Sequence, residues 1–459
     1  MTVDLAIIGG GPAGQAAAEV ASGAGLSVAV LDEQARPGGQ ILRQPPRSFS
    51  VRNWMAGRPY RDLKAQLERF EALDAVQWLG RRSVLGIFPA ASGFDIHVSG
   101  PGGGGKLLAH RVLIAAGCYD LPAALPGWTL PGVMSAGGTQ SFIKSQLLVP
   151  SGRFVLAGTH PLQLIVADQI VQSGGSVACV LFAQPKRHFF RALGSDAFIA
   201  ARHSNVLLAA AAAALRLLRA GVPVHFDAPL AGIDGRDSVI GARWAGATPG
   251  RVDCDRVALC FGFLPQSDLV RMAGADVDWV PSTGGWRAKH DAWMRSSVPG
   301  LYVAGETTGV TGAEVALGEG YIAGLSVVMD HGILSPASAA RMAERVRGRL
   351  RLRYRFAALL DRMASPRSFL GPRCRDTVAC RCEDVTYGTV LDILNTEKPR
   401  TLSGLKLLTR AGMGVCQGRG CEHTILRVFA ETSDVPESDL AGFTARFPAR
   451  PVPIGDFAR

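Results

Sequence analysis

Four cysteines near the C-terminal end of the chain have the type and spacing of cluster ligands. Cys380 and Cys382 form a Cys-x-Cys pair, and Cys416 and Cys421 follow after 33 intervening residues. Two short pairs of this kind, brought together by a helical segment, can supply the four thiolates around the irons of a [2Fe-2S] cluster. The pattern therefore predicts an iron-sulfur centre held by these four side chains.

Two other interpretations of the four cysteines stay open at this point. Zinc accepts the same thiolates, although its usual pairs are spaced Cys-x2-4-Cys rather than Cys-x-Cys. Unlinked core thiols are the second alternative, because free cysteine is often buried.

Glycines let a backbone approach a ligand closely, and four of them bracket the second pair: Gly412, Gly414, Gly418 and Gly420.

A glycine-rich turn near the N-terminus predicts a dinucleotide site. The apolar strand Val3–Ile8 leads into a G-x-G-x-x-G pattern, and a helix up to Gly23 and a strand Ser27–Leu31 complete a βαβ unit. The first glycine permits the tight turn, the second lets pyrophosphate approach, and the third lets helix and strand pack, with the helix N-terminus facing the phosphates. The expected contacts are Gly9, Gly11, Pro12, Ala13 and Gly14.

Two adjacent carboxylates end this unit. Asp32 and Glu33 are placed to accept the hydroxyls of the adenosine ribose. Spacing from the glycines favours Asp32, whereas the downstream Gly-Gly favours Glu33, so the sequence leaves the choice open.

FAD and NAD share this fingerprint, and three later segments favour FAD. Gly38-Gly39-Gln40 resembles the loop that passes the flavin in flavoproteins with two dinucleotide-binding domains. The strands Val112–Gly117 and Leu301–Glu306 resemble the two further FAD segments of that group, with Glu306 in place of the usual Asp. The expected contacts are Gly39, Gln40, Ala116, Gly117, Gly305 and Glu306.

A second Rossmann-like unit is expected from Arg153. Its strand ends at Gly158, but the turn reads Gly158-Thr159-His160 and lacks the second glycine. A side chain at that position obstructs the pyrophosphate, so we expect weak or absent NAD(P)H binding. We interpret His160 as a loop histidine rather than a catalytic base, and no catalytic residue is nominated on the chain.

Dithiol reductases built on this architecture carry a redox cysteine pair beside the flavin. Neither residues 38–46 nor residues 131–144 contain a cysteine. Electrons are therefore expected to leave the flavin by another route, through a cluster held by the C-terminal thiolates.

Composition describes a folded protein, with 47% hydrophobic and 19% charged residues and a formal net charge of +11. The basic residues are dispersed, which argues against nucleic-acid binding, except for an arginine run from Arg341 to Arg355. This run lies on an expected amphipathic helix over residues 335–363, which either faces solvent or docks an acidic partner subunit.

The apolar segment Val206–Leu218 is too short for a membrane span and contains Arg216. Because the first strand begins beside Met1, we expect no signal peptide and a cytoplasmic location. In a reducing compartment, the scattered Cys118, Cys179, Cys254 and Cys260 are expected to be core thiols, and Cys374 receives no role.

Taken together, these motifs resemble the FAD-containing alpha-type (A or B) subunits of multi-subunit dehydrogenases that act on opines, hydroxyproline, proline or glycine, including the cyanide-forming glycine dehydrogenase. The similarity runs from about Val3 to about Val428. Its most specific elements are the cysteine spacing and the stretch Trp128-Thr129-Leu130-Pro131-Gly132-Val133.

The resemblance implies a division of labour. A partner subunit, an amine-oxidising flavoprotein, oxidises a substrate such as D-hydroxyproline, and this chain relays electrons through FAD and a [2Fe-2S] cluster. It also implies a small ferredoxin-like subunit, an FMN at a subunit interface, and peripheral membrane association through the electron acceptor as further possibilities.

We therefore expect an α/β flavoprotein with two dinucleotide-binding domains, Rossmann-like and glutathione-reductase-like, and a small helical C-terminal [2Fe-2S] domain. The alternatives are a self-sufficient NAD(P)H-dependent flavin oxidoreductase and a zinc-stapled assembly or regulatory protein with structural FAD. The expected divisions are an FAD domain in two parts (1–149 and 264–335), an inserted domain (150–263), a basic helical linker (336–370), the cluster domain (371–435) and a tail (436–459).

Overall fold

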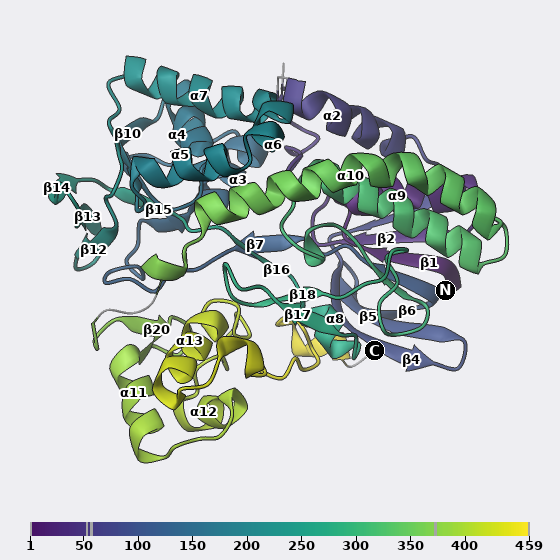
Figure 1. Cartoon of the computed structure of the whole chain (residues 1–459). Coiled ribbons are helices and arrows are strands. Elements are labelled where there is room, and N and C mark those ends of the chain that lie inside the picture. The colour runs from purple at the N-terminus through teal and green to yellow at the C-terminus, as the bar shows by residue number, and fades with distance from the viewer. Residues whose placement is uncertain (1, 52–53, 56–57, 371–373, 458–459) are drawn as a thin grey trace.

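The computed structural model describes residues 2–51, 54–55, 58–370 and 374–457. These residues form two Rossmann-like units and a smaller helical unit that lies beneath them in the view of Figure 1. Gly371, where we expected the cluster domain to begin, lies outside the described residues.

The first unit is built on a seven-stranded sheet of order β3-β2-β1-β6-β5-β4, with β19 also paired to β6. The strands β3, β2, β1 and β6 run parallel, and β4, β5 and β6 form an antiparallel meander. Parallel strands are covered on both faces, which is why their side chains, such as Ile7 and Leu113, are fully buried. The strands are β1 (Thr2–Ile8), β2 (Val28–Asp32), β3 (Val76–Gly80), β4 (Ser83–Ala90), β5 (Gly93–Gly100), β6 (Gly103–Ile114) and β19 (Leu301–Val303).

Helices α1 (Pro12–Gly23), α2 (Arg58–Glu71) and α9 (Ala313–Asp330) belong to the same unit. Helix α9 packs against α1 at very short range, because a Cβ added at Gly320 would lie 2.1 Å from the carbonyl oxygen of Ala13. Late and early segments of the chain therefore meet at the glycine-rich turn.

The second unit has a parallel sheet of order β11-β10-β9-β15-β8 and a three-stranded antiparallel sheet. The antiparallel pair β7 (Cys118–Asp120) and β16 (Phe263–Pro265) carries the chain into and out of this unit. Because β8 precedes residue 150, we propose that the inserted unit begins near Leu121. Its strands are β8 (Val133–Ser135), β9 (Arg153–Gly158), β10 (Ser176–Phe182), β11 (Val224–His225), β12 (Leu230–Gly235), β13 (Val239–Trp244), β14 (Gly250–Asp253) and β15 (Arg256–Cys260), and its helices are α3 (Ala136–Ser141), α4 (Leu162–Gln172), α5 (Lys186–Ser195), α6 (Ala197–Arg202) and α7 (Ser204–Arg219).

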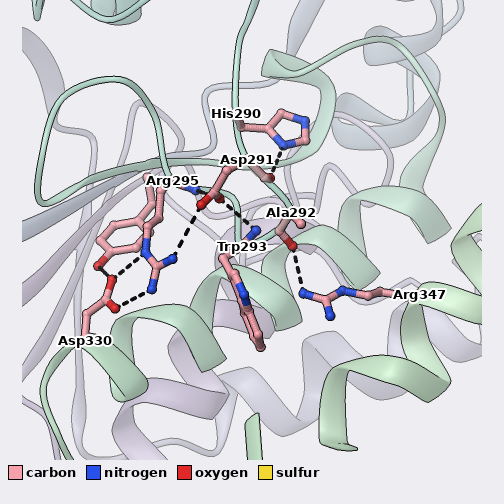
Figure 2. A network of polar contacts seen from close by, with 8 residues as sticks. His290, Asp291, Ala292, Trp293, Arg295, Asp330 and Arg347 are labelled. Carbon is pink, nitrogen blue, oxygen red and sulfur yellow. Dashed lines mark hydrogen bonds and ion pairs between the residues drawn. The ribbon is translucent and has the colours of Figure 1, made fainter. Parts of the chain in front are cut away.

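The arginine run lies on the long helix α10 (Pro336–Ala364), which crosses both units (Figure 1). Arg347 donates to the carbonyl of Ala292 at 3.0 Å, and its guanidinium lies 4.4 Å from the ring centroid of Trp293 (Figure 2). In the same network, Arg295 pairs with Asp330 at the end of α9. At its other end α10 reaches the second unit, where Arg355 and Arg362 approach Asp196. Helix α10 therefore contacts both Rossmann-like units.

The C-terminal unit has a core of its own around fully buried apolar residues such as Val390 and Leu405. It is followed by a tail that returns to the first sheet near β4 (Figure 1). The elements after β16 that complete the chain are α8 (Asp268–Met272), β17 (Val277–Trp279), β18 (Trp286–Ala288), β20 (Val378–Cys380), β21 (Val385–Thr386), α11 (Tyr387–Thr396), α12 (Leu402–Thr409) and α13 (Glu422–Ser433).

Candidate functional site

The glycine-rich turn adopts the backbone that the sequence predicts. Gly9 has φ +111°, and a Cβ added there would lie 2.2 Å from the carbonyl oxygen of Ala115. A Cβ at Gly14 would lie 2.0 Å from the carbonyl oxygen of Gly9 and 3.1 Å from Ile7. Only glycine fits at either position, and the first turn of α1 is left open toward a cavity.

That cavity has a volume of about 510 Å³. Twelve of the thirteen residues predicted to bind the cofactor line it, although they come from five separate segments of the chain. They are Gly9, Gly11, Pro12, Ala13, Asp32, Glu33, Gly39, Gln40, Ala116, Gly117, Gly305 and Glu306. The thirteenth, Gly14, packs behind the turn. The arrangement is that of a long dinucleotide site at the carboxyl ends of parallel strands.

The two carboxylates at the end of β2 have different partners. Asp32 accepts backbone N–H bonds from Gly10 and Gln34, each at 2.7 Å. Burial raises the pKa of Asp32, and these two donors oppose that shift. Glu33 instead pairs with Arg450 at 2.8 Å, and its second oxygen has no protein donor among the described residues. We propose that Asp32 holds the turn in shape and that Glu33 accepts the ribose hydroxyls.

Glu306 and Cys118 face each other in the wall of the cavity. The Cys118 thiol donates to Glu306 Oε2 at 2.8 Å. Burial raises the pKa of Glu306 and raises that of Cys118 well above its ordinary range. A thiol with so high a pKa is a poor nucleophile, so Cys118 lies in the site as a hydrogen-bond donor. The sequence placed Cys118 with the core thiols, because only the β7 crossing brings it to Glu306.

Several cationic residues of the site were missed from the sequence. Arg43, Arg82, Lys144, Arg419 and Arg450 all line the cavity; Arg419 lies between two motif cysteines, and the other four lie outside the motifs. Lys144 is the most buried of them, and burial lowers its pKa to about 8. No sequence signal marks these residues, because the loops that bear them meet only in the folded chain.

The four predicted cysteines come together at the start of the C-terminal unit. The Cys380 thiol contacts that of Cys421, and the Cys382 thiol contacts that of Cys416. The hydrogen bond from Cys421, followed by backbone N–H groups of Gly412 and neighbouring residues, lowers the pKa of Cys380 to about 6. A thiolate is thereby favoured at a ligand position.

Contacts between the thiols link Cys380 with Cys421 and Cys382 with Cys416. Within the described ranges, no group of three or more His, Cys, Asp or Glu side chains converges on a point that could hold a single metal ion. A zinc site needs four ligands around one ion, whereas a [2Fe-2S] cluster takes two thiolates on each iron. Cys380, Cys382, Cys416 and Cys421 provide the four thiolates that a two-iron cluster takes.

Glycines shape this site as expected. A Cβ added at Gly414 would lie 2.2 Å from the Cβ of Cys382, while one at Gly420 would meet only the Cys416 sulfur, at 3.6 Å. Gly418 has φ +88° in the loop between Cys416 and Cys421. Close approach is thus essential at Gly414 and not at Gly420.

The cluster loop and the cavity share a wall. Arg419, between Cys416 and Cys421 in sequence, lines the cavity and pairs with Asp268 at 2.7 Å. Tyr119 also lines the cavity, and burial, Asp268 and Glu422 raise its pKa well above the ordinary range, with a smaller contribution from Cys416.

The second Rossmann-like turn is packed against β15 and Phe263. Thr159 is fully buried and donates its N–H to the carbonyl of Cys260 at 3.0 Å. His160 accepts from the N–H of Leu162 and packs edge-on against Phe263, and burial lowers its pKa to about 4. These contacts give His160 a structural role in the turn.

In the comparison with family models, residues 3–320 match the pyridine nucleotide-disulphide oxidoreductases. Residues 378–431 match the BFD-like [2Fe-2S] binding domain. All four cluster cysteines fall inside the second match, and the glycine-rich turn falls inside the first.

Curated relatives match over the whole chain. The opine oxidase A subunit of Rhizobium meliloti is 32% identical and is covered over 87% of its length by 99% of this chain. Hydrogen cyanide synthase subunit HcnB of Pseudomonas aeruginosa is 30% identical, with 100% of this chain and 98% of the relative covered.

Among solved structures, L-proline dehydrogenase from P. horikoshii has the same fold, with a TM-score of 0.73 at 19% identity over 100% of this chain and 80% of that one. Thioredoxin reductase of T. acidophilum matches 72% of this chain and 99% of its own, with a TM-score of 0.54 at 21% identity. In the part of the chain that the structure describes, no helix is both long and apolar enough to cross a bilayer.

Proposed function

Because this chain belongs to the pyridine nucleotide-disulphide oxidoreductase family and to the group of opine oxidase A subunits and HcnB, we propose a specific role for it. It is the electron-relay subunit of a hetero-oligomeric dehydrogenase that oxidises an amino acid, imino acid or opine. Its cofactors are FAD and a [2Fe-2S] cluster.

FAD accepts electrons in pairs and the cluster carries them singly, so the protein has to bind both groups and keep them close. The open first turn of α1 offers N–H groups to the diphosphate, Glu33 accepts from the ribose, and Glu306 lines the wall beside Gly305. Cys380, Cys382, Cys416 and Cys421 supply the thiolates. No side chain of the chain is assigned a proton-transfer step on the substrate.

The observation that carries this proposal is the shared wall between the two sites. Arg419 belongs to the ligand loop and lines the FAD cavity, so the loop that bears Cys416 and Cys421 forms part of the cavity wall. In the wall of the same cavity, Gly137 and Gly138 occupy positions within the segment 131–144, where dithiol reductases of this architecture carry cysteines. Electrons that enter FAD therefore have the cluster as their exit.

Substrate oxidation itself is assigned to a partner, an amine-oxidising flavoprotein, with a small ferredoxin-like chain as a further subunit. A candidate face for the partner is the outer stripe of α7, where Leu208, Leu215 and Leu218 are 67, 46 and 71% exposed. Residues 186–221 around it contain one acidic residue, Asp196, which already pairs with arginines of α10. We therefore expect an acidic, partly apolar surface on the partner.

The test is anaerobic purification of the native complex, followed by analysis of iron, labile sulfide, zinc and FAD. We expect roughly two irons and two sulfides per chain, as a [2Fe-2S] centre requires, together with one FAD. Addition of an amino- or imino-acid substrate to the complex should then reduce the cluster, observed by electron paramagnetic resonance. Zinc in place of iron, or a cluster that stays oxidised while the flavin bleaches, would contradict the relay.

The self-sufficient NAD(P)H oxidoreductase is tested with the same preparation. The buried Thr159 and the packed His160 leave the second turn without the backbone opening that pyrophosphate needs, so NADH and NADPH should not bleach the flavin. Rapid bleaching of the isolated chain by either nucleotide would favour the oxidoreductase.

A further inference from the structure

The C-terminal tail returns to the first Rossmann-like unit and is fixed there at several points. The N–H of Ala449 donates to the carbonyl of Leu85 at 2.7 Å, and Phe447 packs edge-on against Phe88 with ring centroids 5.5 Å apart. Further on, Asp456 accepts a hydrogen bond from Ser99. The last described residues, in the short helix η5 (Ile454–Phe457), lie against β6. The tail is therefore part of the folded FAD unit.

Arg450 of this tail lines the FAD cavity with 22% of its side chain exposed. Its Nε lies 2.8 Å from Glu33 Oε1, and its Nη2 donates to Gln266 Oε1 at 2.8 Å. Since Glu33 ends β2, where dinucleotide folds bind the ribose, Arg450 lies at the adenosine end of the cavity.

Arg419 of the ligand loop reaches the same place from the other side. Its Nη1 donates to the carbonyl of Cys416 at 3.1 Å and its Nη2 to the carbonyl of Ala449 at 2.8 Å. The same Nη2 lies 2.7 Å from Asp268 Oδ2 as an ion pair rather than as a well-aligned hydrogen bond. Only 17% of the Arg419 side chain is exposed.

These contacts form one continuous series of polar interactions from the ligand loop to the adenosine end of the cavity. It starts at the backbone of Cys416, passes through Arg419 to Asp268 and Ala449, and continues through Arg450 to Glu33. Asp268 approaches both arginines, at 2.7 and 3.9 Å, and holds them together.

We propose that Arg419 and Arg450 form a clasp over the adenosine end of the FAD cavity, so that FAD is retained only while the cluster loop and the tail are in place. The proposal rests on the proposed function for the identity of the two cofactors. Binding energies at coupled sites are reciprocal, so bound FAD should in turn stabilise the ligand loop.

The experiment measures the rate of FAD release from the anaerobically purified holoprotein, as the rise of flavin fluorescence after dilution. Arg419→Met and Arg450→Met each remove one half of the clasp, and Arg450→Lys keeps the charge without the forked geometry. Arg446→Met is the control in the tail, since Arg446 is exposed and has no ion pair in the described ranges. Arg410→Met is the control in the cluster unit, because Arg410 pairs with Glu383 and does not line the cavity.

We expect release on the order of tenfold faster for both clasp variants, an intermediate rate for Arg450→Lys, and wild-type rates for both controls. Removal of the cluster from wild-type protein with a chelator should speed FAD release to a similar degree. If Arg419→Met does not fold, the rate of FAD release from Arg450→Met alone tests the proposal, because Arg450 lies outside the ligand loop.

Wild-type release rates in both clasp variants, with iron content and cluster spectrum intact, would overturn the clasp and leave the electron relay standing. Faster release in both variants from a protein that holds zinc instead of iron would support the clasp, because the contact requires an ordered loop rather than iron. In that event the relay alone would fail.

Discussion

The thiol of Cys118 donates to Oε2 of Glu306 across 2.8 Å, and both side chains lie in the wall of the cavity beside the glycine-rich turn. The two residues are 188 positions apart in sequence. Cys118 follows the strand β6, and Glu306 follows β19, which pairs with β6 in parallel. Neighbouring strands thus deliver the thiol and the carboxyl to the same edge of the sheet.

Loss of the Cys118 donor should destabilise the protein in a pH-dependent way. Cys118→Ala removes the donor and leaves a buried oxygen of Glu306 unpaired, at a cost of about 1–3 kcal/mol in the free energy of unfolding. The Cys118 donor stabilises the Glu306 carboxyl most when that carboxyl is ionised. The loss in the free energy of unfolding should therefore be larger at pH 8 than at pH 5. Urea unfolding at both pH values measures it, with Cys118→Ser as the matched control that keeps a donor. Equal losses in the Ala and Ser variants would show that packing alone is responsible.

Substitution of the two carboxylates at the end of β2 should have opposite consequences. Asp32→Ala removes the acceptor of the Gly10 and Gln34 N–H groups, so it should lower the stability of the FAD-free protein by about 1–3 kcal/mol. Glu33→Ala should leave that stability within about 0.5 kcal/mol and weaken FAD binding instead. Thermal unfolding of the FAD-free protein and fluorescence titration with FAD separate the two. The reverse pattern would assign the ribose to Asp32.

Cluster assembly should require glycine at position 414 but not at position 420. Gly414→Ala places a Cβ 2.2 Å from that of Cys382 and should prevent cluster assembly while FAD stays bound. Gly420→Ala introduces only an ordinary contact of 3.6 Å with the Cys416 sulfur and serves as the control. Iron and sulfide analysis with the visible spectrum gives the readout. A full cluster in Gly414→Ala would mean that the loop can move away from Cys382.

His160 should make the fold less stable in mild acid. Burial lowers its folded pKa to about 4 from an ordinary 6.5, so the unfolded chain takes up the proton first as the pH falls. The stability that neutral His160 gives to the folded state is therefore complete above about pH 6.5. It is lost progressively as the pH falls to about 4. Between pH 7.5 and pH 5, the free energy of unfolding of the wild-type protein should fall by on the order of 1–2 kcal/mol more than that of His160→Asn.

Urea unfolding of both proteins at the two pH values measures this difference. Asn can accept the Leu162 N–H as His160 does, and the other buried histidines are common to both proteins and cancel. Parallel pH dependence in the two proteins would contradict a neutral, buried His160.

Local patterns were sufficient to predict the elements of both Rossmann-like units. The predicted strand Val3–Ile8 is β1, and the predicted strand Ser27–Leu31 is β2, each to within one residue at its ends. Glycine spacing, apolar strands and cysteine pairs act within a few residues of one another, so they can be read along the chain. The family, identified by resemblance to these motifs, and the two cofactors are confirmed by the comparisons.

The sequence alone determined which backbone could approach a phosphate and which side chains could be thiolate ligands, because both depend on residue type at short spacing. Only the tertiary structure shows that Asp32 accepts from the backbone of Gly10 and Gln34, and that Glu33 pairs with Arg450 from the far end of the chain. It also decided that Cys118 meets Glu306 and that Arg419 joins the cluster loop to the cavity. Such contacts arise from strand order and from a returning tail, and no local spacing encodes them.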